Sequence, residues 1–417
     1  RWKQTMKNSR LASFDILYDI LKNGAYSNIA VDKGLAEVDS KDRGFTSRLV
    51  YGVVERKLTL DYFIDKFLTS KAKPKVKILL YIGAYQILFM DKVPDAVAVY
   101  ETVEIADLIG LSYYKKLINA VLHKIIDCKS ELDETDDLSI KYSCPPHLIN
   151  MWKKMYGEEK TLVTLQAINN RPPVFAIPNR KFVDEGELQY ELLDNGVDCE
   201  VYGDVIKINS SFDLSNIKAF KDGLFYIEDY SSFSCAKALD CTNGETVLDI
   251  CAAPGGKTFT MAQSGANVYA FDLYEHRVAL IKKSAERLEL YNIKSSVNDA
   301  LVYNENIPFA DKILCDVPCS GFGIIRRKPE IRYKNLDDIK ELPQIQYDIL
   351  NTSSKYLKNN GRIIYSTCTL NKKENEKVVE KFLNNNTNFK LINEITVFPS
   401  ENSGDGFFYA IMEKIND

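Results

Sequence analysis

The stretch that decides the fold is Val247-Leu-Asp-Ile-Cys-Ala-Ala-Pro-Gly-Gly-Lys-Thr258. It opens with apolar residues, which is typical of a buried parallel strand, and runs through two adjacent glycines into a helix. Gly255 and Gly256 let a ligand approach the backbone closely, and the helix that follows presents unpaired N–H groups to an anion. A strand, a glycine-rich turn and a helix in this order predict a ligand-binding turn of an α/β sheet.

Two better-known glycine-rich motifs do not fit this turn. A P-loop requires a glycine five residues before Gly256, where this chain has Cys251. The dinucleotide fingerprint requires G-x-G-x-x-G, whereas the two glycines here are adjacent. For the segment taken alone, a plain tight turn without a ligand stays open as an alternative.

Around this turn, residues 241–417 alternate between short apolar strands and amphipathic helices. The predicted strands are Val247–Cys251, Val268–Phe271, Lys312–Asp316 and Arg362–Ser366. The predicted helices lie near Thr258–Gln263, Glu275–Leu290, Gln344–Leu357 and Glu374–Leu383. This alternation predicts a Rossmann-like parallel sheet covered by helices on both faces. Ligands of such sheets bind at the carboxyl ends of the strands.

Acids and cysteines follow the predicted strands. Asp272, Asp299 and Asp316 stand at consecutive strand ends, where a carboxylate can accept hydrogen bonds from ribose hydroxyls. Cys319 and Cys368 each follow a strand, so both thiols are expected at the same edge of the sheet. A single cysteine is more often a small buried apolar residue. Two of them beside three acids and a glycine-rich turn favour a nucleoside site with reactive thiols.

No metal site is predicted. Cys315 and Cys319 have C-x-x-x-C spacing, and no second pair of Cys or His follows them. His123, His147 and His276 lie in three different segments, so structural roles are the better interpretation.

The chain before residue 241 divides into two further parts. Apolar residues recur at helical spacing over residues 1–130, as at Leu11, Phe14, Leu17 and Leu21, and predict an all-helical bundle. An acidic stretch at 128–140 breaks this periodicity. Residues 143–240 predict a small α+β module, with short strands at Val174–Ile177 and Val205–Ile208.

Composition sets the broad class. The 417 residues predict two to three domains, and 45% hydrophobic with 27% charged residues is ordinary for a globular protein. The longest apolar run, Ile78–Met90, is too short to span a membrane, and no secretory signal opens the chain. Because Met6 is a candidate start, residues 1–5 are interpreted as a leader or tag. Nine cysteines without framework spacing predict reduced thiols and a cytoplasmic protein.

The net charge of -4 does not indicate a nucleic-acid-binding protein, which usually has a strongly basic domain. Residues 1–127 nevertheless hold 20 Lys and Arg against 15 Asp and Glu. A basic run, Arg326-Arg327-Lys328 with Arg332 and Lys334, follows Cys319 and is a candidate for holding RNA phosphates. A solvated charged loop is an equally good interpretation of that run.

Four segments together carry a specific resemblance. They are 249–258, Asp316-Val-Pro-Cys-Ser-Gly321, Ser366-Thr-Cys-Thr-Leu370 and Gly404-Asp-Gly-Phe-Phe-Tyr-Ala410. Over nearly its whole length the chain strongly resembles the bacterial 16S rRNA cytosine-carbon-5 methyltransferases of the Sun/Fmu type. Ile227-Glu-Asp-Tyr-Ser-Ser232 resembles the start of that family's catalytic domain.

The amino-terminal region resembles the NusB antitermination factor. This likeness rests on Leu49-Val-Tyr-Gly52, Tyr85-Gln-Ile-Leu88, Val97–Val103 and Asn119-Ala-Val-Leu122, after which His123 stands where the family often has arginine. The resemblance implies a helical RNA-binding domain at 1–130, a small α+β module at 143–240 and a Rossmann-like methyltransferase domain at 241–417.

The resemblance also implies a role for each site residue. S-adenosylmethionine would be held at its methionine end by Cys251, Ala252, Ala253, Pro254, Gly255, Gly256 and Lys257. Asp272 would hold the ribose, Asp299 would reach the adenine, and Asp316 would border both cofactor and cytosine. Cys368 would be the nucleophile and Cys319 would assist release of the product.

These residue types suit methylation of cytosine. Carbon 5 is a poor nucleophile until a thiolate adds to carbon 6, which is covalent catalysis. A protonated Asp316 hydrogen-bonded to the ring would stabilise the adduct. The expected partner is 16S rRNA, free or in a partly assembled small subunit, with no membrane and no metal, and nothing calls for more than a monomer. Two alternatives stay open: the same chemistry on tRNA or another RNA, and a non-catalytic RNA-binding ribosome-assembly factor. A P-loop NTPase is disfavoured by Cys251.

Overall fold

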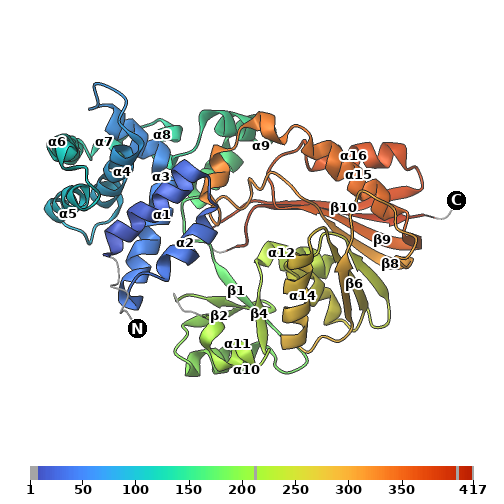
Figure 1. Cartoon of the computed structure of the whole chain (residues 1–417). Helices are drawn as coiled ribbons and strands as arrows, with labels where there is room; N and C mark the ends of the chain where they lie inside the picture. The colour runs from blue at the N-terminus through green and yellow to red at the C-terminus, as the bar shows by residue number, and fades with distance from the viewer. Residues whose placement is uncertain (1–7, 211–213, 401–402, 416–417) are drawn as a thin grey trace. The chain divides into compact units, whose positions relative to one another are not determined.

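The computed structural model describes residues 8–210, 214–400 and 403–415 (Figure 1). The leader or tag predicted at residues 1–5 lies outside these residues. Contacts divide the chain into two units, one formed by Arg1–Lys154 with Arg327–Lys334, the other by Met155–Arg326 with Asn335–Asp417. Within the described part of the chain, no helix is both long enough and apolar enough to cross a membrane.

The first unit is helical, as the sequence predicts. Its α-helices are α1 (Ser9–Asn23), α2 (Ser27–Leu35), α3 (Arg43–Asp65), α4 (Pro74–Phe89), α5 (Asp95–Leu108), α6 (Lys115–Asp127), α7 (Glu131–Glu134) and α8 (Leu138–Tyr142). Helix α9 (Pro146–Ala167) begins here and is interrupted at Gly157, whose backbone is not helical.

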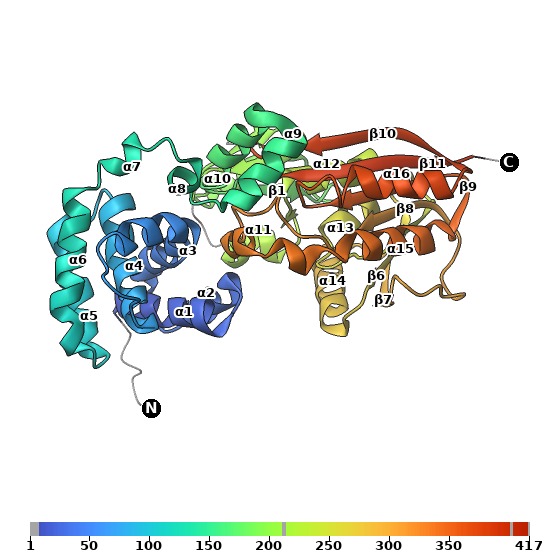
Figure 2. The ribbon, with the colours of Figure 1, turned by 90° about the horizontal axis from the view of Figure 1, so that it is seen from above.

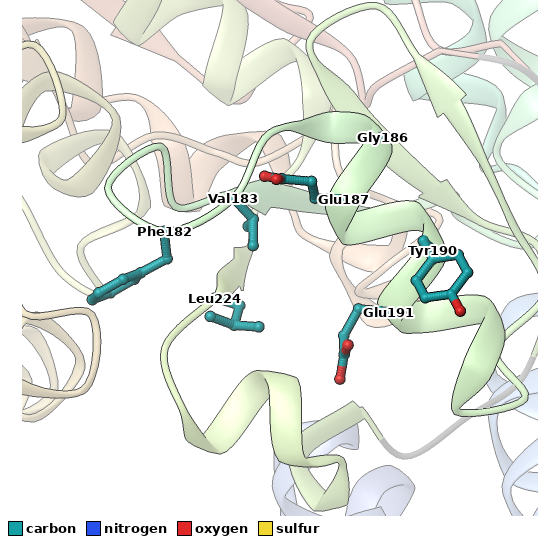
Figure 3. Close-up of a pocket in the computed structure, with 7 residues that line it drawn as sticks. All are labelled: Phe182, Val183, Gly186, Glu187, Tyr190, Glu191 and Leu224. Carbon is teal, nitrogen blue, oxygen red and sulfur yellow. The ribbon is translucent and has the colours of Figure 1, made fainter.

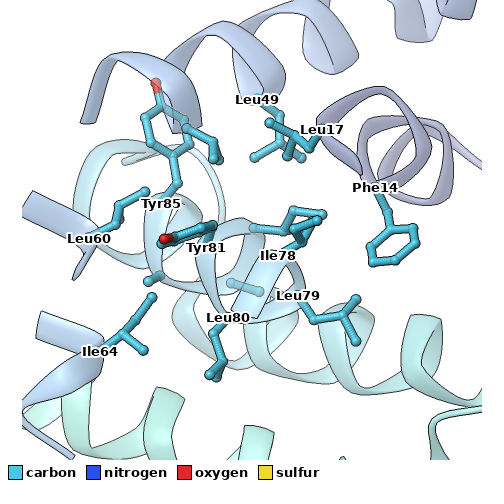
Figure 4. Close-up of a cluster of buried hydrophobic side chains, with 14 of the residues drawn as sticks. Phe14, Leu17, Leu49, Leu60, Ile64, Ile78, Leu79, Leu80, Tyr81 and Tyr85 are labelled. Carbon is cyan, nitrogen blue, oxygen red and sulfur yellow. The ribbon is translucent and has the colours of Figure 1, made fainter. Parts of the chain in front are cut away.

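Helix α4 is the centre of this unit. It begins with Pro74, whose missing N–H costs nothing in the first turn, and most of its side chains are buried. A helix that is apolar on all sides must be enclosed by others, and Ile78, Tyr81 and Tyr85 pack among residues of α1 and α3 (Figure 4). Two of the NusB-like segments meet here, since a Cβ on Gly52 would overlap the Tyr85 ring.

A short segment of the carboxyl-terminal half completes the helical unit. The 3-10 turn Pro329–Tyr333 contributes Arg332, which is fully buried and donates hydrogen bonds to the carbonyl oxygens of Glu55 and Ser143 at 2.9 and 3.0 Å. Tyr333 donates from its hydroxyl to the carbonyl of Val54 at 3.0 Å. The chain therefore leaves the second unit after residue 326 and returns to it at residue 335.

The second unit contains two sheets. The smaller one has the order β2-β3-β1-β4 and is antiparallel throughout. Its strands are β1 (Val174–Pro178), β2 (Cys199–Tyr202), β3 (Val205–Ile208) and β4 (Phe225–Ile227). Helix α10 (Glu185–Asp194) covers it and begins with a capping box between Asp184 and Glu187, and α11 (Lys218–Lys221) precedes β4.

The larger sheet has the order β10-β11-β9-β8-β5-β6-β7 (Figure 1). Its strands are β5 (Thr246–Asp249), β6 (Asn267–Asp272), β7 (Ile293–Val297), β8 (Ala310–Asp316), β9 (Leu357–Thr367), β10 (Phe389–Val397) and β11 (Phe407–Lys414). The five strands from β5 to β9 are parallel, as predicted. Strand β11 runs antiparallel to both of its neighbours, β9 and β10, so the sheet is mixed rather than wholly parallel.

Helices cover both faces of this sheet because side chains alternate along each strand. Val247, Val268 and Leu314 pack with α12 (Tyr230–Ala238), α13 (Gly256–Ala262) and α14 (Glu275–Arg287). Their neighbours Leu248 and Ile313 point the other way and pack with α15 (Leu342–Ser354) and α16 (Glu376–Asn385), which lie side by side (Figure 2).

The two sheets share one apolar cluster. Phe175 of β1 and Tyr226 of β4 belong to the same buried group as Val247 of β5. The division into three domains at 1–130, 143–240 and 241–417 stays a prediction.

Candidate active site

The candidate site lies where the parallel strands β5, β6, β8 and β9 end. Residues 251–257 comprise the turn after β5 and the first two residues of α13, and Asp272 and Asp316 are the last residues of β6 and β8. Cys368 follows β9 directly and Cys319 comes three residues after Asp316. Because parallel strands end at one edge, segments up to about 120 residues apart in sequence meet there.

Buried acidic side chains pack closely against the glycine-rich turn. Asp249, which is 1% exposed, accepts a hydrogen bond from the hydroxyl of Thr258 at 2.6 Å. Burial raises the pKa of Asp249 to about 7. A Cβ on Gly256 would lie 2.8 Å from the carboxylate of Glu228, so only glycine fits beneath the turn without a shift.

Asp272 and Asp299 differ in how firmly they are held. Asp272 is 3% exposed, accepts from the backbone N–H of Ala253 at 3.3 Å and pairs with Arg277 at 3.2 Å. These contacts fix the carboxylate beside the glycine-rich turn. Asp299 is exposed two residues after β7 and accepts from the backbone N–H of Leu301 at 3.0 Å.

A lysine and an aspartate form an ion pair at the centre of the site. Lys257 Nζ lies 2.7 Å from Asp316 Oδ2 and donates to the hydroxyl of Ser232 at 3.0 Å. The second oxygen of Asp316 accepts from the Ser366 hydroxyl at 2.9 Å. Burial opposes the charge on Lys257, but Asp316 and then Glu228 outweigh it and raise the pKa of the ammonium group.

The two predicted cysteines are in contact. Cys319 Sγ lies 3.2 Å from Cys368 Sγ. This contact, and then burial, raise the pKa of Cys319 well above its usual value. All nine cysteines are free thiols, and burial also raises the pKa of Cys235 and Cys315, which keeps those two in the unreactive protonated form.

Comparisons with known proteins identify the two parts of the chain. The family model described as 16S rRNA methyltransferase RsmB/F matches residues 236–413, and the model of the NusB family matches residues 7–127. A probable ribosomal RNA small subunit methyltransferase B of Bacillus subtilis is 34% identical over 439 residues, which cover 96% of this chain and 98% of the relative. The chain belongs to the ribosomal RNA small subunit methyltransferase B family.

Further relatives agree with this assignment. The ribosomal RNA small subunit methyltransferase B of Cronobacter sakazakii is 30% identical and covers 98% of this chain and 99% of the relative. The crystal structure of the protein PH0851 matches with a TM-score of 0.82 and 26% identity over 99% of this chain and all of that one. A methyltransferase homologue from Pyrococcus horikoshii matches with a TM-score of 0.60 and 27% identity over 67% of this chain and 98% of that one.

Members of this family are S-adenosylmethionine-dependent methyltransferases, and the residues of this site fit that cofactor. Asp249 Oδ1 is buried and has no hydrogen-bond partner among the described residues, although a buried polar atom normally has one. Gly255 and Gly256 pack closely against Phe259 and Glu228, and the Asp272 carboxylate lies beside the same turn. Carboxylates around the turn attract the positive charge of a sulfonium.

The basic run after Cys319 does not behave as predicted. Arg326 is 3% exposed, pairs with Asp405 and donates to the carbonyls of Ser400 and Ser403 at 2.7 and 2.8 Å. Arg332 is enclosed in the helical unit. Neither guanidinium is free to hold a phosphate, so the phosphate-binding prediction is wrong for these two residues. It stays a prediction for Arg327, Lys328 and Lys334, of which Lys328 is exposed.

Several residues of the site were missed. Glu228 and Ser232 lie in the segment 227–232, which resembles the family without a role having been assigned to it. Burial raises the pKa of Glu228 to about 8. The polar character of Glu228 and Ser232 among apolar residues is the sequence signal that could have marked them as site residues. Glu374 and Asn375, both fully buried, were missed because nothing local distinguishes them from a helix start.

A pocket of about 480 Å³ lies elsewhere, against α10 (Figure 3). It is lined by Phe182, Val183, Gly186, Glu187, Tyr190, Glu191 and Leu224. None of the predicted site residues lines it. The carboxylates of Glu187 and Glu191 would repel an RNA backbone, so this pocket is not part of the candidate site.

Proposed function

We propose that this chain methylates carbon 5 of a cytosine in 16S ribosomal RNA, with S-adenosylmethionine as the donor. The observation that carries this proposal is the contact of Cys319 and Cys368 beside the Lys257–Asp316 pair. The name shared by its relatives supports small-subunit rRNA as the substrate. The nine free thiols support action in the reducing cytoplasm.

The cofactor would be held by the turn at 251–257, with Asp272 at its ribose and Asp299 at its adenine. When bound, S-adenosylmethionine supplies an electrophilic methyl group on a positively charged sulfur. Lys257 pairs with Asp316, and this carboxylate would border both the cofactor and the base. The RNA base has to be unstacked or come from a loop to reach this edge.

Cys368 is proposed as the nucleophile. Its thiol loses a proton, the sulfur lone pair forms a bond to carbon 6, and the electrons of the C5–C6 double bond make carbon 5 nucleophilic. Carbon 5 then takes the methyl group, and the electrons of the broken S–CH3 bond stay on the donor sulfur, which becomes a neutral thioether. A base takes the carbon-5 proton, the electrons of the C5–H bond restore the C5–C6 double bond, and the C6–S bond breaks to return the thiolate. Cys319, in contact with Cys368, assists this release.

The test compares the wild type with Cys319→Ala and Cys368→Ala on unmodified 16S rRNA with radiolabelled S-adenosylmethionine. We expect Cys319→Ala to leave a covalent protein–RNA band on a denaturing gel and Cys368→Ala to leave none. Bisulfite sequencing of the product locates the modified base. If Cys368→Ala traps RNA and Cys319→Ala does not, the two roles are reversed.

The same assay separates the alternatives. Methyl transfer to tRNA but not to 16S rRNA would mean that tRNA is the substrate, while the proposed reaction at the two cysteines would stand. Absence of transfer and of trapping with either RNA would favour a non-catalytic ribosome-assembly factor, and the proposal would fall.

A further inference from the structure

Two consecutive buried residues, Glu374 and Asn375, lie behind the thiol pair. Both are 0% exposed and stand in the turn between β9 and α16, six and seven residues after Cys368. The established chemistry of a cysteine nucleophile does not require either of them. Each nevertheless makes side-chain hydrogen bonds to a segment that carries one of the cysteines.

Glu374 holds the segment of Cys319. Its Oε2 accepts from the backbone N–H of Ser320 at 2.8 Å, and its Oε1 accepts from the hydroxyl of Ser320 at 2.6 Å. Gln346 donates to Oε2 at 3.0 Å and also to the carbonyl of Pro318 at 2.9 Å. The residues on both sides of Cys319 are therefore tied to one carboxylate and its partner.

A fourth hydrogen bond saturates this carboxylate. Asn371 donates from its amide to Oε1 at 2.7 Å, so each oxygen accepts twice. Four donors fill the acceptor positions of the two carboxyl oxygens, and all four donors are uncharged groups.

Asn375 holds the segment of Cys368. Its Oδ1 accepts from the hydroxyl of Thr367 at 2.6 Å, and its Nδ2 donates to the carbonyl of Thr369 at 2.9 Å. These are the residues immediately before and after Cys368. One amide side chain thus spans the cysteine on both sides.

The two segments are also joined directly. The hydroxyls of Ser320 and Thr369 lie 2.7 Å apart, and the N–H of Gly323 donates to the carbonyl of Cys368 at 3.0 Å. A change in one segment therefore reaches the other, but a change at Glu374 acts first on Cys319 and a change at Asn375 acts first on Cys368, because each side chain bonds the residues next to that cysteine.

We propose that Glu374 and Asn375 are positioning residues for the two thiols, Glu374 holding Cys319 through Ser320 and Asn375 holding Cys368 through Thr367 and Thr369. This inference rests on the proposed function, because it uses the roles assigned there to the two cysteines. A buried carboxylate that served the fold alone would affect both thiols alike. Positioning predicts instead that the two residues fail at different steps of one reaction.

The test is the covalent protein–RNA band together with steady-state turnover. Glu374→Gln places an amide NH₂ against donors and loosens Cys319, so we expect the adduct to accumulate as in Cys319→Ala. Asn375→Ala loosens the nucleophile, so we expect little adduct, as in Cys368→Ala. Because a misplacement near 1 Å can cost on the order of 10²-fold, each variant should lose about that factor in kcat, with the KM for S-adenosylmethionine within about twofold of the wild type.

The matched control is Glu380→Gln, which removes an exposed carboxylate from the following helix and should keep wild-type turnover. Ser320→Ala removes a single hydroxyl and serves if either main variant fails to fold. It should raise the adduct level in the direction of Cys319→Ala.

Equal adduct levels in Glu374→Gln and Asn375→Ala, or wild-type turnover in either, would overturn the positioning roles. If Glu374→Gln or Asn375→Ala does not fold, an adduct level in Ser320→Ala equal to that of the wild type would also overturn the positioning roles. Failure of the proposed function itself is distinguishable, because Cys319→Ala would then give no covalent protein–RNA band, whatever the behaviour of the Glu374 variant.

Discussion

Cys319 Sγ and Cys368 Sγ lie 3.2 Å apart although 49 residues separate them in the chain. Adjacent sulfur atoms suit a substrate whose two reacting atoms, carbon 5 and carbon 6 of one ring, are themselves bonded neighbours. The proximity arises because β8 and β9 are adjacent parallel strands, paired as Asp316 with Ser366. The distance is therefore a property of the sheet register as well as of the two loops.

The Lys257–Asp316 pair should be essential. Lys257→Met leaves Asp316 and Glu228 without their shared cation, and breaking a buried pair costs about 3–5 kcal/mol. We expect methyl transfer to fall by at least about 10²-fold and the melting temperature to drop. Adding Asp316→Asn should restore part of the stability and none of the activity. Lys373→Met, an exposed change in the turn that follows Cys368, is the control. Wild-type transfer by Lys257→Met would contradict this role.

Glu228 should make stability fall as pH rises. Burial raises its pKa from the ordinary 4.5 to about 8, so the folded protein holds a proton that the unfolded chain has released between these values. Its contribution is fully present below about 4.5 and is lost as pH approaches about 8. In Glu228→Gln, the difference between the free energies of unfolding at pH 5 and pH 8, measured with urea, should be smaller than in the wild type by on the order of 3 kcal/mol. Part of the slope should survive, because Asp249 has a pKa raised in the same direction. Equal slopes in variant and wild type would refute the prediction.

The buried pair of Arg326 and Asp405 should stabilise the loop that precedes β11. Arg326→Met leaves a buried carboxylate without its cation and should cost about 3–5 kcal/mol of the free energy of unfolding, measured with urea. The double variant Arg326→Met, Asp405→Leu should recover part of that loss, since no charge is then left buried. A double variant as unstable as the single one would mean that the hydrogen bonds to the loop, and not the charge pair, hold this region.

Exposed and buried basic residues of one run should act differently on RNA binding. Lys328→Glu should weaken binding and lower the salt dependence, by about 0.7–0.9 in the log–log slope for each phosphate that is no longer neutralised. Arg332→Met should lower the stability of the helical unit instead, because three backbone carbonyls lose their donor. Filter binding over a salt series measures the slopes, with Lys355→Glu as an exposed control. An unchanged slope in Lys328→Glu would remove this run from the RNA interface.

Much of the larger sheet could be predicted because its signals are local. The strands β5, β6 and β8 are short apolar runs, each ending in aspartate, and the adjacent Gly255 and Gly256 mark the turn. Strands β10 and β11 were missed for a physical reason. β10 is an edge strand, and its Lys390, Asn393 and Glu394 dilute the apolar pattern that a buried strand shows.

The parallel core, the order of the chemical motifs along it and the family of the chain could all be predicted, because each depends on a contiguous pattern of residues. Which polar side chains serve the site depends instead on tertiary contacts. Arg326 and Arg332 looked like an RNA contact until their partners, many residues distant, enclosed them. Glu374 and Asn375 carried no signal until folding brought Ser320 and Thr369 against them. Burial and long-range hydrogen bonding set the role of a polar residue, and neither is written in its neighbours along the chain.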